Sequence, residues 1–124
     1  AAGVNAVIVS NAKTDLYHPN IIRGSLGGLF LIPIAIDSSK KTIHYLKRNN
    51  ISIVATSLSK KSKDYKEIKY ERPIALIFGS EDKGLDDIWY EESNEIVKIP
   101  TNYPIDSLNL SVSAAILIYH SLND

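Results

Sequence analysis

Short apolar runs alternate with segments that favour helices along this chain of 124 residues. The runs are rich in β-branched residues, which pack well in strands. The expected strands are Val4–Val9, Leu31–Ile36, Ile51–Ala55, Ile74–Phe78 and Ile96–Ile99. Strands that alternate with helices form mainly parallel sheets, because each helix returns the chain to the same end of the sheet. The sequence therefore predicts an α/β fold with a largely parallel sheet and helices on both faces.

Four segments between or after these runs favour helices. They extend from Pro19 to about Leu29, from Ser38 or Ser39 to Arg48, over Asp86–Ser93, and from about Asn109 to Leu122. Proline at a first helical position and serine at an N-cap are typical helix starts. In the second helix we expect Ile43, Leu46 and Tyr45 to face inward and His44 to lie on the surface. The glycines of the first helix indicate a close backbone approach or tight helix packing.

Length and composition exclude several classes of protein. A chain of 124 residues fits one domain with one core, and no linker divides it. Cysteine is absent, which excludes a disulfide framework, cysteine-based zinc sites and thiol catalysis, and favours a reducing compartment such as the cytoplasm. The apolar stretch Leu29–Ile36 contains Pro33 and is too short to span a bilayer, so we expect no membrane role.

Charge is unevenly distributed although the formal net charge is zero. Residues 1–72 contain 12 Lys and Arg against 5 Asp and Glu, a balance of +7, and residues 73–124 have a balance of −7. Much of the excess lies in Lys60–Arg72, which we expect to be a long exposed connection. Clustered lysines focus a positive field and indicate an anionic partner, but a solvated surface loop would explain them equally well.

The loop after the fourth expected strand, Gly79–Leu85, carries residues suited to a ligand. Gly79 and Gly84 allow positive φ and close approach to the backbone, and Glu81 can accept hydrogen bonds. The loop has neither the Gly-Lys-Ser/Thr end of a Walker loop nor the spacing of a dinucleotide loop. Its acidic residues would repel phosphate, so a neutral or cationic ligand is favoured. An ordinary turn between strand and helix would also explain the loop.

A second loop follows the fifth expected strand. Pro100 begins it, Ser107 or Asp106 can cap the last helix, and Asn109 offers an amide that both donates and accepts hydrogen bonds. A third strand ends at Thr56. In open α/β sheets, ligands bind where strands end at the carboxyl edge. The two loops and Thr56 therefore predict a shared pocket built mostly of backbone.

These motifs resemble those of a known family. Ile-Phe-Gly-Ser-Glu-Asp-Lys-Gly-Leu at 77–85, then Ile-Pro at 99–100 and Ser-Leu-Asn-Leu-Ser-Val-Ser-Ala-Ala-Ile at 107–116, resemble the second and third motifs of the SpoU (TrmH-type) RNA 2′-O-ribose methyltransferases of the SPOUT superfamily. Residues 1–10 resemble the end of the first motif. His18–Pro33 resembles the Asn-Pro-x-x-x-Arg-x-Ser-x-Gly segment of that family. The resemblance covers essentially the whole chain and keeps the order and spacing of the motifs.

The resemblance implies a trefoil-knotted methyltransferase that binds S-adenosylmethionine, methylates structured rRNA or tRNA, and works as a homodimer. The catalytic residues it implies are Glu81, Ser107 and Asn109. Those implied for the cofactor are Thr56, Gly79, Glu81, Gly84, Ile99, Pro100, Ser107 and Leu108. The residues expected at RNA, from the charge pattern and the resemblance together, are Arg23, Lys60, Lys61 and Lys63.

One part of the family pattern lies upstream of this sequence. The key arginine of the family and a preceding asparagine belong to the first half of the first motif, and Arg23 corresponds to a separate arginine. We therefore expect residues 1–124 to be a catalytic domain that lacks its first strand and most of its first helix. The alternatives are a noncatalytic knotted module for RNA binding or dimerisation and, from the strand and helix alternation alone, a flavodoxin-like nucleotide binder.

Overall fold

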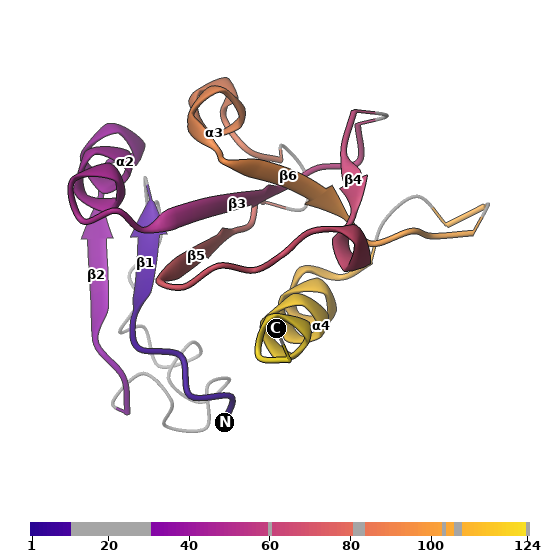
Figure 1. Ribbon diagram of the computed structural model, residues 1–124, viewed down its shortest axis with the longest axis horizontal. Coiled ribbons are helices and arrows are strands. Elements are labelled where there is room, and N and C mark those ends of the chain that lie inside the picture. Colours follow the sequence, from indigo (N-terminus) through magenta and orange to yellow (C-terminus); the bar gives the residue numbers. More distant parts are fainter. Residues whose placement is uncertain (11–30, 60, 81–83, 103, 106–107, 124) are drawn as a thin grey trace. The chain divides into compact units, whose positions relative to one another are not determined.

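The computed structural model (Figure 1) describes residues 1–10, 31–59, 61–80, 84–102, 104–105 and 108–123. The elements are β1 (Val7–Ser10), β2 (Ile34–Asp37), α2 (Ser39–Arg48), β3 (Ser52–Thr56), β4 (Lys63–Asp64), the 3₁₀ helix η2 (Tyr65–Glu67), β5 (Ile74–Ile77), α3 (Asp87–Glu92), β6 (Glu95–Lys98) and α4 (Leu110–Ser121). All five expected strands and three of the four expected helices are present. The remaining helix, expected from Pro19, lies outside the described residues.

The described residues form two compact units. One unit comprises residues 1–42 and the other residues 43–124. The boundary falls inside helix α2, where composition gives no sign of a linker. A sequence pattern that marks linkers therefore could not have located it.

In the first unit, β1 and β2 pair in parallel, with Val7 opposite Ile34. Strand β2 begins just after Pro33, whose carbonyl accepts a hydrogen bond from the Val7 N–H at 3.0 Å. The continuous apolar run Val4–Val9 predicts a strand covered on both faces, but this prediction is wrong for the described residues, since Val7 and Ile8 are 38% and 39% exposed. An apolar run predicts a strand, but how far that strand is buried depends on elements that are distant in sequence.

The second unit contains a four-stranded parallel sheet with the order β4-β6-β3-β5. Strand β3 is central and pairs with β5 and β6. Its residues Ile53, Val54 and Ala55 are fully buried. Near the start of β3, Asn94 accepts a hydrogen bond from the Ile53 N–H through its side chain and donates its own N–H to the Ile53 carbonyl, each at 2.8 Å. The parallel sheet predicted from the sequence is confirmed.

Helices cover both faces of this sheet, as expected. On one face, Val54 and Val97 pack in a buried cluster with Leu117 of α4. On the other face, Ile53 packs with Trp89 of α3 and with apolar residues of α2. Successive residues of a strand point to opposite faces, so β3 contributes to both clusters. Figure 1 shows α3 and α4 on opposite sides of the sheet.

Helix α2 begins as predicted but turns one aromatic residue outward. The Ser38 hydroxyl accepts a hydrogen bond from the Lys41 N–H at 3.2 Å, which caps the helix. Ile43 and Leu46 are buried, and His44 is exposed, as expected. The inward placement predicted for Tyr45 is wrong: this side chain is 55% exposed, because its position lies beyond the face that packs on the sheet. Among the described helices, none is long and apolar enough to cross a membrane.

The expectation that Lys60–Arg72 is an exposed connection is wrong in part. Strand β4 lies within it and pairs with β6, and Ile68 and Tyr70 are buried in the cluster beneath α4. The Tyr70 hydroxyl donates a hydrogen bond to the Tyr65 carbonyl at 2.6 Å, and both rings contact the His120 ring edge-on. The described lysines of the segment are exposed while Ile68 and Tyr70 point inward, so the segment is an edge of the fold.

Candidate functional site

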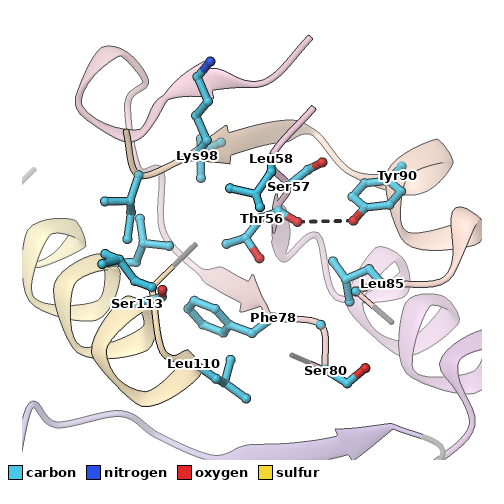
Figure 2. A pocket seen from close by; sticks show the side chains of 16 residues that line it. Thr56, Ser57, Leu58, Phe78, Ser80, Leu85, Tyr90, Lys98, Leu110 and Ser113 are labelled. Carbon is cyan, nitrogen blue, oxygen red and sulfur yellow. Dashed lines mark hydrogen bonds between the residues drawn. The ribbon is translucent and has the colours of Figure 1, made fainter. Parts of the chain in front are cut away.

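A cavity of about 330 Å³ lies where β3, β5 and β6 end at the carboxyl edge of the sheet (Figure 2). Helix α4 forms one wall through Leu110, Ser113 and Leu117, and α3 contributes Tyr90. Parallel strands end at the same edge, so loops separated by up to about fifty residues in sequence come together there. The pocket predicted at this edge is therefore present.

Thr56 joins the strand ends that form the base of the cavity. Its hydroxyl donates a hydrogen bond to the Ile77 carbonyl at 3.1 Å, and its own carbonyl accepts one from the Tyr90 hydroxyl at 3.4 Å (Figure 2). The next residue, Ser57, donates its N–H to the Val97 carbonyl at 2.9 Å. These bonds fix the end of β3 to β5, β6 and α3, so the base of the cavity is preorganised.

The loop after β5 closes on itself through its two glycines. Ser80 and Gly84 form an antiparallel bridge in which the Gly84 N–H donates to the Ser80 carbonyl at 2.9 Å. Gly84 has a φ of +68°, a conformation that favours glycine. A Cβ on Gly79 would lie 2.3 Å from the Gly84 carbonyl carbon, so only glycine fits there. The two ends of the loop thus pack backbone against backbone at the cavity.

Asn109 begins helix α4 as its N-cap. Its side-chain oxygen accepts hydrogen bonds from the Ser111 N–H at 2.8 Å and the Ser111 hydroxyl at 2.6 Å, and its carbonyl accepts the Ser113 N–H at 2.9 Å. The side chain is exposed and is not among those that line the cavity. These bonds hold the carboxamide of Asn109 by its oxygen, and its NH₂ group takes no part in them.

The structure brings together most of the described residues that the motifs assign to a cofactor. Thr56, Gly79, Gly84, Ile99 and Leu108 all line the cavity. Pro100 instead lines a second cavity next to it, together with Leu58, Lys98, Ile99 and Thr101. Predicted residues that lie outside the described part of the chain are Glu81, Ser107, Arg23 and Lys60.

The two remaining lysines predicted at RNA, Lys61 and Lys63, are exposed. Lys63 donates to a Glu95 carboxylate oxygen at 3.0 Å, with both side chains partly in solvent. Exposed pairs of this kind contribute about 0–1 kcal/mol to stability. Within the described residues no ion pair involves Lys61.

Sequence reasoning missed more than half of the residues that line the cavity. The residues missed are Ser57, Leu58, Phe78, Tyr90, Val97, Lys98, Leu110, Ser113 and Leu117. Several of these directly follow or precede the predicted strand ends, and that adjacency was a usable signal. No sequence signal indicated Tyr90, because a residue of helix α3 lines the cavity only as a result of tertiary packing.

The wall of the cavity is largely apolar and carries little charge. Lys98 is the one charged residue among the described lining residues. In Figure 2 its ammonium group points away from Thr56 and Phe78, so its aliphatic stem forms the wall. No group of three or more metal-ligating side chains occurs among the residues that the structure describes. The interior suits a ligand with an aromatic ring and hydroxyl groups.

The sequence profile of the SpoU rRNA Methylase family matches residues 1–119. The chain belongs to this family. The resemblance of its motifs to the SpoU methyltransferases is thereby confirmed. A relative, the 23S rRNA (guanosine(2553)-2′-O)-methyltransferase RlmP of Bacillus subtilis, is 31% identical over 120 residues, which are 97% of this chain and 48% of RlmP.

Two solved structures of RNA methyltransferases have a similar fold. A crystal structure of an RNA 2′-O ribose methyltransferase is 37% identical with a TM-score of 0.89, over 98% of this chain and 46% of that one. The AdoMet-bound rRNA methyltransferase from Sinorhizobium meliloti is 30% identical with a TM-score of 0.93, over 98% and 47%. The chain spans about half the length of the relatives it matches.

Proposed function

We propose that residues 1–124 form the catalytic domain of an RNA methyltransferase that transfers a methyl group from S-adenosylmethionine to a ribose 2′-oxygen of structured rRNA or tRNA. The observation that carries the proposal is the cavity where β3, β5 and β6 end, since the two motif loops of the family build it. The similarity to an AdoMet-bound rRNA methyltransferase over 98% of the chain supports it.

The cavity fits S-adenosylmethionine in size and chemistry. Its volume of about 330 Å³ lies at the lower end of the usual range for small-molecule sites, roughly 300–1,000 Å³. Phe78, Leu110 and Leu117 offer apolar surface for an adenine ring, and the tightly closed glycine loop brings backbone groups to the wall. The ammonium of Lys98 points out of the cavity, so it does not oppose a sulfonium cation.

When bound, S-adenosylmethionine supplies a methyl group on a sulfonium, which becomes a neutral thioether as the ribose oxygen takes the methyl. The chain must hold the donor, orient the ribose and accept or relay the hydroxyl proton. We assign these roles to Glu81, Ser107 and Asn109. The two hydrogen bonds from Ser111 support the role assigned to Asn109. They hold the Asn109 side chain by its oxygen, so that its NH₂ group can act as a donor.

We propose that the chain contacts RNA through its positive half, is trefoil-knotted, acts in the cytoplasm and forms a homodimer. The strand order supports the knot, because β6, the last strand, lies between β4 and β3. An exposed apolar stripe along α4 and its C-cap residue supports the dimer; it consists of Val112, Ala115, Tyr119 and Leu122.

Calorimetric titration with S-adenosylmethionine and with S-adenosylhomocysteine tests the site. Ser113→Leu places a larger side chain on the α4 wall and should abolish saturable binding. His44→Leu, an exposed helix position outside the cavity, is the control and should bind normally. Equal affinity of both variants would remove the α4 wall from the site.

Methyl transfer to total rRNA or tRNA, followed with isotopically labelled cofactor, tests the activity. Label in ribose 2′-O-methyl nucleosides after digestion is the expected result. Cofactor binding with no transfer would favour the noncatalytic RNA-binding or dimerisation module. Failure to bind the cofactor, together with binding of flavin mononucleotide, would favour the flavodoxin-like alternative.

A further inference from the structure

A second cavity adjoins the first and shares part of its wall. Leu58, Lys98 and Ile99 line both cavities, and Pro100 and Thr101 line the second alone. It therefore lies along the segment that leaves β6 and the turn that leaves β3. Transfer of a group between two bound molecules requires two adjacent subsites, so that the reacting atoms lie close together where the subsites meet.

Leu58 is an apolar side chain that lies in solvent, and hydrogen bonds hold the residues next to it. It is 59% exposed. The Ser59 N–H donates to the Ser57 hydroxyl at 3.1 Å, the Lys61 N–H to the Ser59 hydroxyl at 3.2 Å, and the Ser62 N–H to the Ser59 carbonyl at 3.0 Å. These bonds fix the turn that presents Leu58, so the exposed apolar surface is preorganised for contact.

Lys98 places a positive charge beside this surface. Its stem lines both cavities, and its ammonium points away from the first. Asp64 lies opposite Lys98 in the β4–β6 pairing, but one of its carboxylate oxygens accepts the Lys66 N–H at 3.0 Å. Among the described residues no ion pair includes Lys98. The charge is therefore available to an anionic group that reaches the second cavity.

We propose that the second cavity is the subsite for the RNA nucleotide that carries the acceptor ribose. Leu58 and Pro100 contact the apolar faces of the nucleoside, and the Lys98 ammonium pairs with an adjoining phosphate. A ribonucleotide combines these two features, an apolar base face and a nearby phosphate anion. The inference rests on the proposed function, because it assigns the acceptor side of the same transfer.

Lys98→Gln tests the charge, because glutamine keeps most of the stem and removes the ammonium. The probe is a short fluorescent oligouridylate, whose anisotropy is followed over a range of salt concentrations. We expect weaker binding and a salt slope smaller by about 0.7, as when one phosphate of a single strand is no longer neutralised. Lys41→Gln removes an exposed charge that lines neither cavity and should keep the original slope. Leu58→Ala should weaken binding without changing the slope.

Crosslinking locates the subsite directly. A thiouridine-containing oligoribonucleotide, irradiated on the protein, should attach within residues 57–59 or 98–101. Cofactor titration of the unaltered protein tests the first cavity separately. If the unaltered protein binds no cofactor, the proposed function itself fails. Three results would contradict the subsite while leaving the cofactor site intact. The unaltered protein would bind cofactor but no RNA, its crosslinks would lie only in other segments, or the Lys98→Gln variant would keep the original salt slope.

Discussion

Two glycines of one loop, Gly79 and Gly84, are needed for different physical reasons. At Gly79 any side chain would collide with backbone, since a Cβ would lie within 2.7 Å of three atoms of Gly84 and Leu85. At Gly84 there is open space around a Cβ, and the constraint is its φ of +68°. Backbone cannot move aside as a flexible side chain can. The requirement at Gly79 is therefore the more severe.

Gly79→Ala should open the loop and lose cofactor binding, while Gly84→Ala should keep binding and lose about 1–2 kcal/mol of stability. Gly84→Asn should lose less than Gly84→Val, because asparagine tolerates the left-handed conformation and a β-branched residue does not. Calorimetry measures the binding and urea unfolding the stability. Unaltered cofactor affinity in Gly79→Ala would contradict the role of this loop closure.

Among individual residues, the sequence predicted those that contribute to the cavity next to a strand end. It missed those whose side chains line the cavity from another element. Gly79, Gly84 and Thr56 lie next to strand ends, so the rule for α/β sheets located them. Tyr90 lines the cavity from a short helix, and its partner is a main-chain carbonyl of β3. Such an interaction depends on how α3 packs on the sheet, which no local pattern encodes.

Among the elements, the segment from β4 to Tyr70 differs most from expectation. Its charged residues suggested a solvated loop, yet Ile68 and Tyr70 lie in the same buried cluster as Val54 and Leu117. Apolar residues two positions apart among charged ones follow the period of a half-buried edge. That period was readable in the sequence. A two-residue strand such as β4 is too short for any periodic signal.

Ile68→Ala should lower the free energy of unfolding by about 2–5 kcal/mol, because it leaves a cavity beneath α4. Lys69→Ala, at an exposed neighbouring position, should change it by less than about 0.5 kcal/mol. Urea denaturation of both variants gives the comparison. Were the segment a solvated loop, the two substitutions would have equal and small effects.

The longer elements were predictable because several independent signals agreed. Helix α2 has a serine cap and a consistent apolar face, and α4 starts at the expected Asn109. The strands were identified by β-branched runs, with ends that shift by a few residues. The strand order β4-β6-β3-β5 was not predicted, because strands that follow one another in sequence need not be neighbours in a sheet.

On the scale of the whole molecule, ion pairs join the positive first half of the sequence to the negative second half. Lys47 pairs with Glu92, and Lys63 pairs with Glu95. Each pair combines a lysine from residues 1–72 with a glutamate from residues 73–124. The +7 balance of the first half is therefore reduced where these pairs form. Lysines outside such pairs, among them Lys61, contribute more of the field that an anion would meet.

Lys61 and Lys63, both predicted to contact RNA, differ in whether a glutamate among the described residues pairs with them. Lys61→Ala should weaken binding of an oligoribonucleotide more than Lys63→Ala, because the Lys63 charge is already opposed by Glu95. Removing the cation that neutralises one phosphate of a single strand reduces the salt slope by about 0.7. Anisotropy titrations at several salt concentrations measure both effects. A slope that is flat for the unaltered protein would show that charge does not drive the interaction.

The proposed homodimer depends on the exposed stripe of α4. Leu117 is fully buried against the sheet, whereas Val112, Ala115, Tyr119 and Leu122 repeat at helical spacing on an exposed side. A helix with one buried and one exposed apolar side gains from covering the second. In a two-fold interface the same stripe is present on both copies, so a substitution there acts twice.

Tyr119→Glu should convert dimers to monomers, because it places two carboxylates in the shared apolar interface. Tyr45→Glu is the matched control, since Tyr45 is also on a helix and is 55% exposed against 52% for Tyr119. Sedimentation velocity at about tens of micromolar, where a standard interface is filled, distinguishes the states. The unaltered protein and Tyr45→Glu should both sediment as dimers. If the unaltered protein is monomeric at that concentration, the stripe on α4 does not form a homodimer interface.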